Sequence, residues 1–378
     1  MVSTTSYMIG QFNLDNINIL KEMNFQVHVA CNFIKGIGWT VKESKNLLNK
    51  LKEEGVFCHQ IDFDPSPFNI SADKLAYKQL DNLFKKYNFD LMHCQTPVGG
   101  VIARQVAKKY RTKVIYVAHG FHFFKGAPKK NWLLYYPVEK HMSHYTDLLV
   151  TINNEDNSLA KRKFKAKKIE KINGAGVNTK KFSRDLARRK KTRSDFNIPD
   201  EKVVLLSVGE LNNNKNHETV IKAISKIDHK NLFYVIAGVG EKRAYLQNLI
   251  NKLKLQNVVK LAGYRNDIEN LYSMADIFVF PSQREGLSSA GVEAMSAGLP
   301  IIGSNVRGIK DFMVDGKSGY LVSPLNVNAF AQKITLLEKD QSKRLQMGTY
   351  NKETAKKFDI SNVHNQMKKV YEGINLNN

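Results

Sequence analysis

The sequence predicts an α/β protein made of two Rossmann-like domains that face each other across a ligand-binding cleft. Three observations support this fold class. Short runs of β-branched and apolar residues alternate with longer amphipathic stretches, as in the βα units of a parallel sheet. The pattern occurs twice, and a glycine turn followed by a basic segment separates the two halves. A chain of 378 residues also fits two domains of ordinary size better than one.

Five apolar runs predict the strands of the first half, with helices between them. They are Val27–Ala30, Val56–Gln60, Leu91–Cys94, Val114–Ala118 and Leu148–Ile152. The start of the chain departs from this pattern, because the polar run Ser3–Ser6 stands where a doubly wound domain normally opens on a full apolar strand. Either the first strand is unusually short or the chain lacks several residues, and we give slightly more weight to the second explanation.

Six further runs predict the strands of the second half. They are Val203–Val208, Phe233–Gly238, Val258–Leu261, Ile277–Phe280, Ile301–Gly303 and Tyr320–Val322. The turn at Gly174–Gly176 and the basic segment after it predict a linker, with an N-terminal domain over residues 1–175 and a C-terminal domain over residues 176–358. Apolar residues at helical spacing between Ile360 and Tyr371 predict a final helix, within residues 359–378, that packs back on the fold.

The composition predicts a folded protein of the cytoplasm. Hydrophobic residues make up 42% of the chain, and no apolar run approaches the roughly 18 residues that a membrane span requires. The first residues have neither the basic leader nor the apolar core of a signal peptide. Three widely spaced cysteines, Cys31, Cys58 and Cys94, are expected to be buried thiols in a reducing compartment.

The formal charge of +23 predicts an anionic partner, which could be nucleic acid, an anionic membrane face or a phosphorylated small molecule. Lys161–Arg193 holds 15 Lys and Arg against 2 Asp and Glu, and is either a solvated face or a membrane-binding surface. A second candidate surface joins basic and bulky apolar residues, and its alternative is an internal helix whose rings face the core. Its members are Lys125, Lys129, Lys130, Trp132, Leu133, Leu134, Tyr135 and Tyr136.

The most informative segment is Pro281–Met295, which follows a predicted strand and turns into a helix. Loop amides and the positive end of a helix dipole converge at such a turn and form a natural phosphate site. The segment also carries two carboxylates, Glu285 on the loop and Glu293 in the helix. They would repel a phosphate ligand unless they accept hydrogen bonds from its hydroxyls, so the combination favours a sugar nucleotide. The alternative is that Glu285 caps the helix and Glu293 is a surface residue.

This segment resembles the signature of the retaining glycosyltransferases of family 4, which have the GT-B fold. The signature is two glutamates with seven residues between them after a Pro-Ser turn, followed here by Glu-Ala-Met and Gly-Leu-Pro as in the family. The resemblance covers essentially the whole chain apart from its start. It implies that Glu285 binds donor-sugar hydroxyls at the catalytic centre, that Glu293 binds the ribose, and that the turn between them holds the donor. The residues of that turn are Gly286, Leu287, Ser288 and Ser289.

A second match follows the predicted strand Val203–Val208. Family members commonly have Gly-Arg there and then a lysine, with both cations on the donor pyrophosphate. Gly209 and Lys215 match, which implies that Lys215 neutralises the leaving diphosphate during catalysis. Glu210 stands in place of the arginine, so Arg284 or Arg265 is expected to substitute. The surrounding Gly-Glu-Leu-Asn and Lys-Asn are similar to those of the exopolysaccharide and capsule members of the family.

The N-terminal half offers a further catalytic candidate. His119 follows the predicted strand Val114–Ala118 and matches the histidine that family members place near the donor sugar and the reacting oxygen. The alternative is a structural histidine bonded to a nearby backbone group. The resemblance also implies an acceptor side, with a structural role as the alternative for His93. The acceptor-side residues are Gly10, His93, Gly99 and His122.

Two loops of the C-terminal half complete the expected donor site. Gly238 and Gly240 follow the strand Phe233–Gly238 and would lie near the donor diphosphate or base. They are a weak dinucleotide fingerprint, because the third glycine is absent. Arg265 follows the next strand, in a loop against which family members hold the nucleobase.

These matches predict a hexosyl- or N-acetylhexosaminyl-transferase. It would move a sugar from a nucleotide donor, expected to be UDP-linked, to a lipid-linked saccharide in exopolysaccharide or capsule synthesis, at the inner face of the membrane as a peripheral protein. The donor is a substrate, and we expect no cofactor, no metal and no nucleic-acid partner. The alternatives are a non-catalytic basic protein that binds nucleic acid or membrane on the same fold, and a nucleotide-sugar epimerase, which the Pro-Ser-x-x-Glu-Gly frame does not support.

Overall fold

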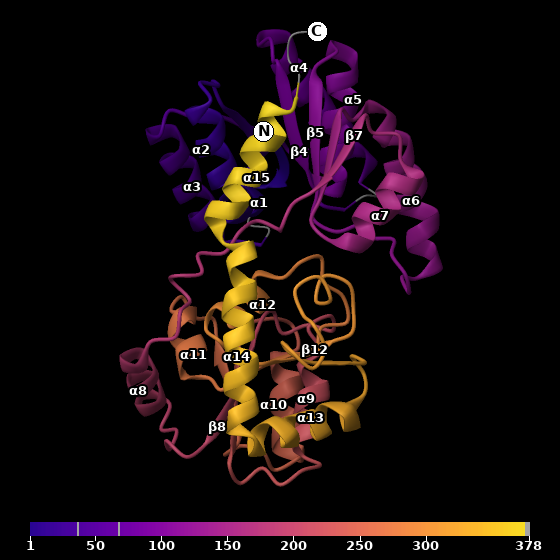
Figure 1. The fold of residues 1–378 in the computed structure, drawn as a ribbon. Helices are drawn as coiled ribbons and strands as arrows, with labels where there is room; N and C mark the ends of the chain where they lie inside the picture. Colours follow the sequence, from indigo (N-terminus) through magenta and orange to yellow (C-terminus); the bar gives the residue numbers. More distant parts are fainter. Residues whose placement is uncertain (36–37, 67–68, 375–378) are drawn as a thin grey trace. The chain divides into compact units, whose positions relative to one another are not determined.

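The computed structural model describes residues 1–35, 38–66 and 69–374 (Figure 1). The chain folds into two compact units. The first consists of residues 1–175 and 363–378, and the second of residues 176–362. Among the described residues, no helix has both the length and the apolar character that crossing a bilayer demands.

The first unit is built on a parallel seven-stranded sheet in the order β3-β2-β1-β4-β5-β6-β7. Its strands are β1 (Val2–Thr5), β2 (His28–Asn32), β3 (Phe57–Gln60), β4 (Leu91–Gln95), β5 (Lys113–Ala118), β6 (Leu148–Thr151) and β7 (Lys168–Lys171). Its helices are α1 (Ser6–Phe12), α2 (Leu14–Glu22), α3 (Val41–Glu53), α4 (Ile70–Lys86), α5 (Pro97–Tyr110), α6 (Lys129–Met142) and α7 (Asn154–Lys163). The helix α15 (Ile360–Glu372) begins in the second unit and continues in the first.

The second unit has a parallel six-stranded sheet in the order β10-β9-β8-β11-β12-β13. Its strands are β8 (Val203–Val208), β9 (Leu232–Ala237), β10 (Val259–Gly263), β11 (Ile277–Phe280), β12 (Ile301–Ser304) and β13 (Gly319–Val322). Its helices are α8 (Leu186–Asp195), α9 (His217–Ile224), α10 (Arg243–Lys252), α11 (Ile268–Met274), α12 (Ser289–Ser296), α13 (Val327–Lys339) and α14 (Gln341–Ala355). Buried clusters lie on both faces of this sheet, one with α9, α10 and α13 and the other with α11 and α12. Each unit therefore has the Rossmann strand order, which confirms the prediction of two Rossmann-like domains.

The polar run at the start of the chain forms a strand, which the apolar pattern does not predict. Val2 of β1 pairs with Ala30 of β2 and with Cys94 of β4, so β1 lies in the middle of the sheet. The Thr4 hydroxyl is buried and lies 2.6 Å from the Thr96 hydroxyl at the end of β4. Small hydroxyl residues can fill this central position because their polar groups find partners inside the fold.

The basic segment Lys161–Arg193 contains regular secondary structure on both sides of the Gly174–Gly176 turn. Before the turn it forms β7, an edge strand whose charged residues hide it from a search for apolar runs. Its end forms α8, a helix of the second unit that packs on α11.

Three arginines from the end of this segment converge on Asp276, the residue before β11. Their guanidinium groups lie 3.3 Å (Arg184), 2.8 Å (Arg189) and 2.6 Å (Arg193) from the Asp276 carboxylate, and the Val204 amide donates to the same group at 2.9 Å. Arg193 is only 2% exposed. Part of the positive charge therefore stabilises the second unit and is not available to an external partner.

Candidate active site

The candidate site lies where the strand order of the second sheet reverses. β8 and β11 are neighbours in that sheet, and the chain leaves their carboxyl ends through the loops 209–216 and 281–288. Ligands of open α/β sheets bind outside the carboxyl ends of the strands at such a switch point. The residues expected to hold the diphosphate and the donor sugar lie in these two loops.

Side-chain amides bind the two loops to each other. Asn214 Nδ2 donates to the Arg284 carbonyl at 3.1 Å, and the backbone N–H of Gln283 donates to the Asn214 carbonyl at 2.8 Å. Gln283 Nε2 also donates to the Asn213 carbonyl at 3.0 Å. Sequence reasoning missed these residues, and the run Asn212–Asn214 after a strand was the available signal, since asparagine favours turns in which it bonds nearby backbone.

Lys215 and Glu285 meet between the two loops. Lys215 Nζ lies 2.7 Å from Glu285 Oε1, and the two side chains are 21% and 11% exposed. The lysine stem runs over Gly209, where an added Cβ would lie 3.1 Å from Cε. Gly238 approaches the same turn so closely that a Cβ there would lie 1.9 Å from the Gly209 carbonyl oxygen. A larger residue at Gly238 would thus displace the turn that supports Lys215.

The helix α12 begins beside this pair with free capacity to bind an anion. Ser288 is its N-cap residue, and the Ser288 side chain makes no capping hydrogen bond. Leu287 packs against the buried cluster on this face, which anchors the turn formed with Gly286 and Ser289. Backbone amides at the start of the helix can therefore donate to a phosphate.

Glu293 lies in α12 and is partly buried, whereas the alternative made it a surface residue; the N-cap of this helix is Ser288 and not Glu285. Tyr272 of α11 donates a hydrogen bond from its hydroxyl to Glu293 Oε2 at 2.9 Å. Loss of surrounding solvent raises the pKa of Glu293 to about 7, although the Tyr272 hydrogen bond acts in the opposite direction. The carboxyl group consequently changes charge close to neutral pH.

The two candidates for the missing arginine differ in their contacts. Arg265 makes a bidentate pair with Asp267, with Nε–Oδ1 and Nη2–Oδ2 distances of 2.8 Å and 2.6 Å. Arg284 is exposed, and its carbonyl belongs to the hydrogen bonds that join the two loops. Glu210 accepts from Asn212 Nδ2 at 2.9 Å, so it helps to form the first loop. Arg284 is the better candidate, because it can reach a ligand without breaking a bidentate pair.

His119 lies in the first unit, directly after β5. Its Nε2 is 2.7 Å from the side-chain oxygen of Gln95, at the end of β4, and its ring packs against Phe12 with 5.5 Å between centroids. Burial lowers the pKa of His119 to about 4, so the ring is neutral at physiological pH. The contact with Gln95 is to a side chain and not to the backbone, and it orients the imidazole.

The acceptor-side residues also lie in the first unit, in separate environments. His93 is buried, with Nδ1 2.7 Å from the Tyr371 hydroxyl of α15, a contact that fits the structural alternative. The Gly99 amide donates to the Thr4 hydroxyl at 3.2 Å, beneath the end of β1. Gly10 lies under the ring of Trp39, and the His122 ring packs on Tyr135 with 4.7 Å between centroids.

Comparison with known proteins identifies the family. The chain is 36% identical over 378 residues to a protein of Bacillus subtilis (strain 168) named "Putative glycosyltransferase EpsD", and the match covers 98% of this chain and 94% of that protein. A family model described as glycosyl transferases group 1 matches residues 188–354, and one described as glycosyl transferase 4-like matches residues 11–153. This chain belongs to the family 4 glycosyltransferases.

Other relatives of this glycosyltransferase agree with that assignment. An Escherichia coli enzyme named UDP-Gal:alpha-D-GlcNAc-diphosphoundecaprenol alpha-1,3-galactosyltransferase is 24% identical, over 96% of this chain and 93% of its own. The structure of Anabaena HepE with UDP and glucose superposes with a TM-score of 0.80 and 18% identity, over 98% of both chains. Sucrose-phosphate synthase from Thermosynechococcus elongatus gives 0.77 and 19%, over 94% and 90% of the two chains. These likenesses show the GT-B fold.

The candidate site offers chemistry suited to a phosphorylated sugar. The α12 amides and Lys215 can hold negative charge, while Glu285 and Glu293 can accept hydrogen bonds from hydroxyl groups. Within the ranges 1–35, 38–66 and 69–374, no three His, Cys, Asp or Glu side chains gather closely enough to hold a metal ion.

Proposed function

We propose that this glycosyltransferase moves a sugar from a UDP-linked donor to a lipid-linked saccharide, with retention of anomeric configuration, in exopolysaccharide or capsule synthesis. The ion pair between Lys215 and Glu285 at the switch point of the second sheet, beside the uncapped start of α12, carries this proposal. The identity to EpsD and the UDP complexes of HepE support the donor class. The lipid-linked acceptor is supported by the name of the Escherichia coli relative.

In the proposed reaction, the bond between the anomeric carbon and the donor phosphate oxygen breaks as the acceptor oxygen attacks from the same face. The charge that develops on the leaving diphosphate is stabilised by Lys215 and by the α12 amides. Glu285 then exchanges its lysine partner for hydroxyls of the donor sugar. No covalent enzyme intermediate is required, and the acceptor proton passes to the departing phosphate.

The remaining residues position the reactants. Glu293 accepts from the ribose hydroxyls while Tyr272 holds the carboxylate in place. Gly209 and Gly238 allow the backbone to approach the diphosphate, and Arg265 borders the base. His119, fixed by Gln95, hydrogen-bonds the substrate near the reacting oxygen, with acceptor groups on the same unit.

A panel of UDP-sugars tests the donor class. We expect UDP and one UDP-sugar to raise the unfolding midpoint of the protein, because a ligand that binds only the folded state stabilises it by mass action. GDP- and ADP-sugars serve as controls. Release of UDP only when a lipid-linked acceptor is added would separate transfer from epimerisation, and the absence of any UDP-dependent shift would contradict the proposal.

The raised pKa of Glu293 predicts that UDP binding depends on pH. Below pH 7 the carboxyl is largely protonated, and above pH 7 it is ionised and accepts more strongly from the ribose hydroxyls. The Glu293→Gln protein serves as the reference, because it lacks the titration of this carboxyl but keeps that of the UDP phosphates. After division by the pH effect in that variant, wild-type affinity for UDP should be about three- to tenfold higher at pH 8 than at pH 6. Calorimetric titration checks this, and equal pH dependence in both proteins would remove the ribose assignment.

Helix α6 is the proposed membrane contact. The rings of Trp132, Tyr135 and Tyr136 pack against the buried cluster of the first unit, as expected for a helix whose rings face the core. Leu133 and Leu134 of the same helix are 76% and 46% exposed. They lie on a helix that begins with the exposed pair Lys129 and Lys130, so leucines and lysines, not aromatic rings, would meet the lipids.

Co-sedimentation with vesicles containing phosphatidylglycerol tests this contact. The variant Leu133→Asp/Leu134→Asp is expected to lose binding by about tenfold, since it places charge on the inserting side of the helix. Leu345→Asp on α14, where the leucine is 59% exposed, is the matched control and should bind like the wild type. Equal binding by all three proteins would place the membrane contact elsewhere.

A further inference from the structure

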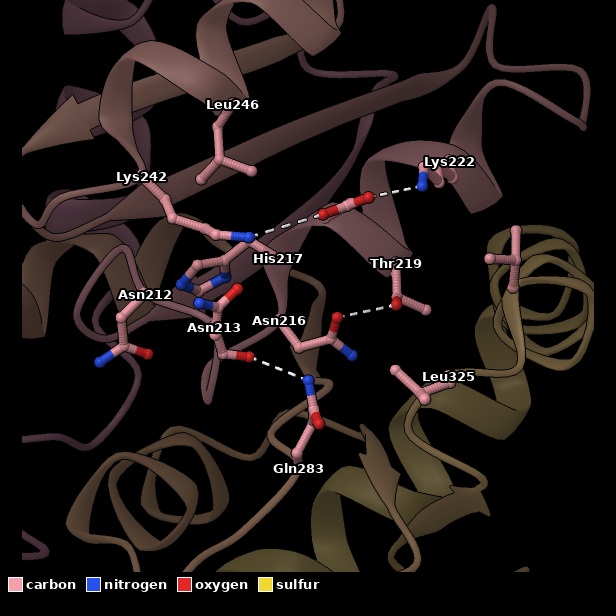
Figure 2. Close-up of a pocket in the computed structure, with 12 residues that line it drawn as sticks. Asn212, Asn213, Asn216, His217, Thr219, Lys222, Lys242, Leu246, Gln283 and Leu325 are labelled. Carbon is pink, nitrogen blue, oxygen red and sulfur yellow. Dashed lines mark hydrogen bonds and ion pairs between the residues drawn. The ribbon is translucent and has the colours of Figure 1, made fainter.

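A polar cavity of about 240 Å³ lies in the second unit and is lined in part by residues of the loop 209–216 (Figure 2). It is bordered by the starts of α9 and α10, by the segment before α13, and by the loops 209–216 and 281–288. Its lining residues are Asn212, Asn213, Asn216, His217, Glu218, Thr219, Lys222, Lys242, Leu246, Gln283, Leu325 and Val327. Lys215 and Glu285 are not among them, although four lining residues belong to the loops 209–216 and 281–288 of the proposed donor site.

The start of α9 supplies one feature of an anion site. Asn216, its N-cap residue, lies in the left-handed region at φ 54°, and its side chain makes no capping hydrogen bond. The Asn216 side chain is instead engaged with the Thr219 hydroxyl and with the carbonyls of Pro281 and Pro324. The positive end of the α9 dipole therefore faces the cavity without a capping side chain.

His217 supplies an independent feature. It is 3% exposed and lines the cavity, and neither ring nitrogen makes a hydrogen bond of proper geometry, although the carbonyls of Gly209 and Glu210 lie nearby. A buried polar group without a partner is costly, and a ligand oxygen in the cavity would relieve this cost. Figure 2 shows the ring beside Asn213 and Lys242.

Charge and size define the ligand class. Lys222 and Lys242 flank the carboxylate of Glu218, at 2.5 Å and 3.9 Å, which leaves an excess positive charge. Lys242 also lies over the Tyr245 ring, with Nζ 4.7 Å from the ring centroid. The cavity is smaller than the roughly 300–1,000 Å³ typical of pockets for drug-sized ligands, so it suits a single sugar ring and not a nucleotide sugar. Amide groups and the apolar side chains of Leu246 and Leu325 match the hydroxyls and C–H groups of such a ring.

We propose that this cavity binds a phosphorylated monosaccharide, with its phosphate at Lys242, Lys222 and the start of α9. The bound ligand contacts the loops that hold Lys215 and Glu285, because Asn213 and Gln283 belong to both environments. Ligand binding thus changes donor affinity, and the donor changes ligand affinity by the same factor. The hexose-phosphate site does not rest on the proposed function, whereas its coupling to donor binding does.

Calorimetry with glucose 6-phosphate, glucose 1-phosphate, inorganic phosphate and glucose tests the site on the full chain, with and without saturating UDP. We expect a hexose phosphate to bind in both conditions, and glucose and phosphate to bind at least tenfold more weakly. Lys242→Ala should weaken binding at least fivefold. Lys252→Ala, at the exposed end of the same helix, is the matched control and should have no effect.

Two results distinguish this site from the donor site. Lys215→Ala should weaken hexose-phosphate binding much less than Lys242→Ala does, and UDP should not displace the sugar phosphate. Displacement by UDP, loss of binding in Lys215→Ala, wild-type affinity in a folded Lys242→Ala protein, or no binding of either hexose phosphate would each overturn the proposal. A failure of the donor assignment would appear instead as absent UDP binding, with hexose-phosphate binding intact.

Discussion

Replacing Lys215 with alanine is expected to lower kcat for sugar transfer by about 10²–10³-fold, the usual cost of removing one electrostatic stabiliser of a transition state. Lys215 Nζ already lies 2.7 Å from Glu285 in a largely buried setting, so the cation is positioned before the donor arrives. Its removal leaves the leaving diphosphate with the α12 amides and the candidate cation Arg284, without the cation that is already held in place. Initial rates of UDP release at saturating donor and acceptor measure the effect.

Controls for this variant separate charge from folding. Lys226→Ala removes an exposed lysine of the same unit, whose Nζ donates to the Asn328 side-chain oxygen at 2.9 Å, and should keep wild-type turnover. Lys215→Arg retains the positive charge and should recover part of the lost rate. Wild-type turnover in a folded Lys215→Ala protein would remove this residue from the mechanism.

The second large effect is structural. Asp276→Asn is expected to destabilise the second unit by about 3–5 kcal/mol, since removing one partner of a buried ion pair leaves uncompensated charge. Arg193 is the buried member of the cluster, and it would lose its 2.6 Å contact with a carboxylate while Arg184 and Arg189 remain beside it. Urea unfolding followed by circular dichroism measures the change.

The matched control for Asp276 is Asp195→Asn, an exposed carboxylate at the end of α8. It should alter stability by no more than about 0.5 kcal/mol, as surface substitutions usually do. If Asp276→Asn behaved like this control, the convergence of the three arginines would contribute little to stability.

The sequence predicted the strands that are apolar and missed those that are not. The runs at Val203–Val208 and Ile277–Phe280 coincide with β8 and β11, because central strands of a parallel sheet are buried on both faces. β1 was hidden by its hydroxyl residues and β7 by its charges, since periodicity records hydrophobicity and cannot detect hydrogen bonds made across the fold.

The sequence predicts those site residues that a motif places at a fixed spacing along the chain. It does not predict the residues that tertiary packing brings beside them. The spacing of Glu285 and Glu293 was readable from the chain, whereas the partner of each, Lys215 and Tyr272, is set by packing of distant elements. The same limit applies to Asp276, because a count of charges cannot show that arginines far along the chain share one carboxylate.

A crystal structure of the protein with UDP tests the central claim most directly. We predict that a diphosphate oxygen lies about 3 Å from Lys215 Nζ and that the α12 amides donate to the same group. The ribose hydroxyls should donate to Glu293, with Tyr272 still bonded to it. A UDP molecule bound without contact to Lys215, Glu293 or the start of α12 would contradict this account.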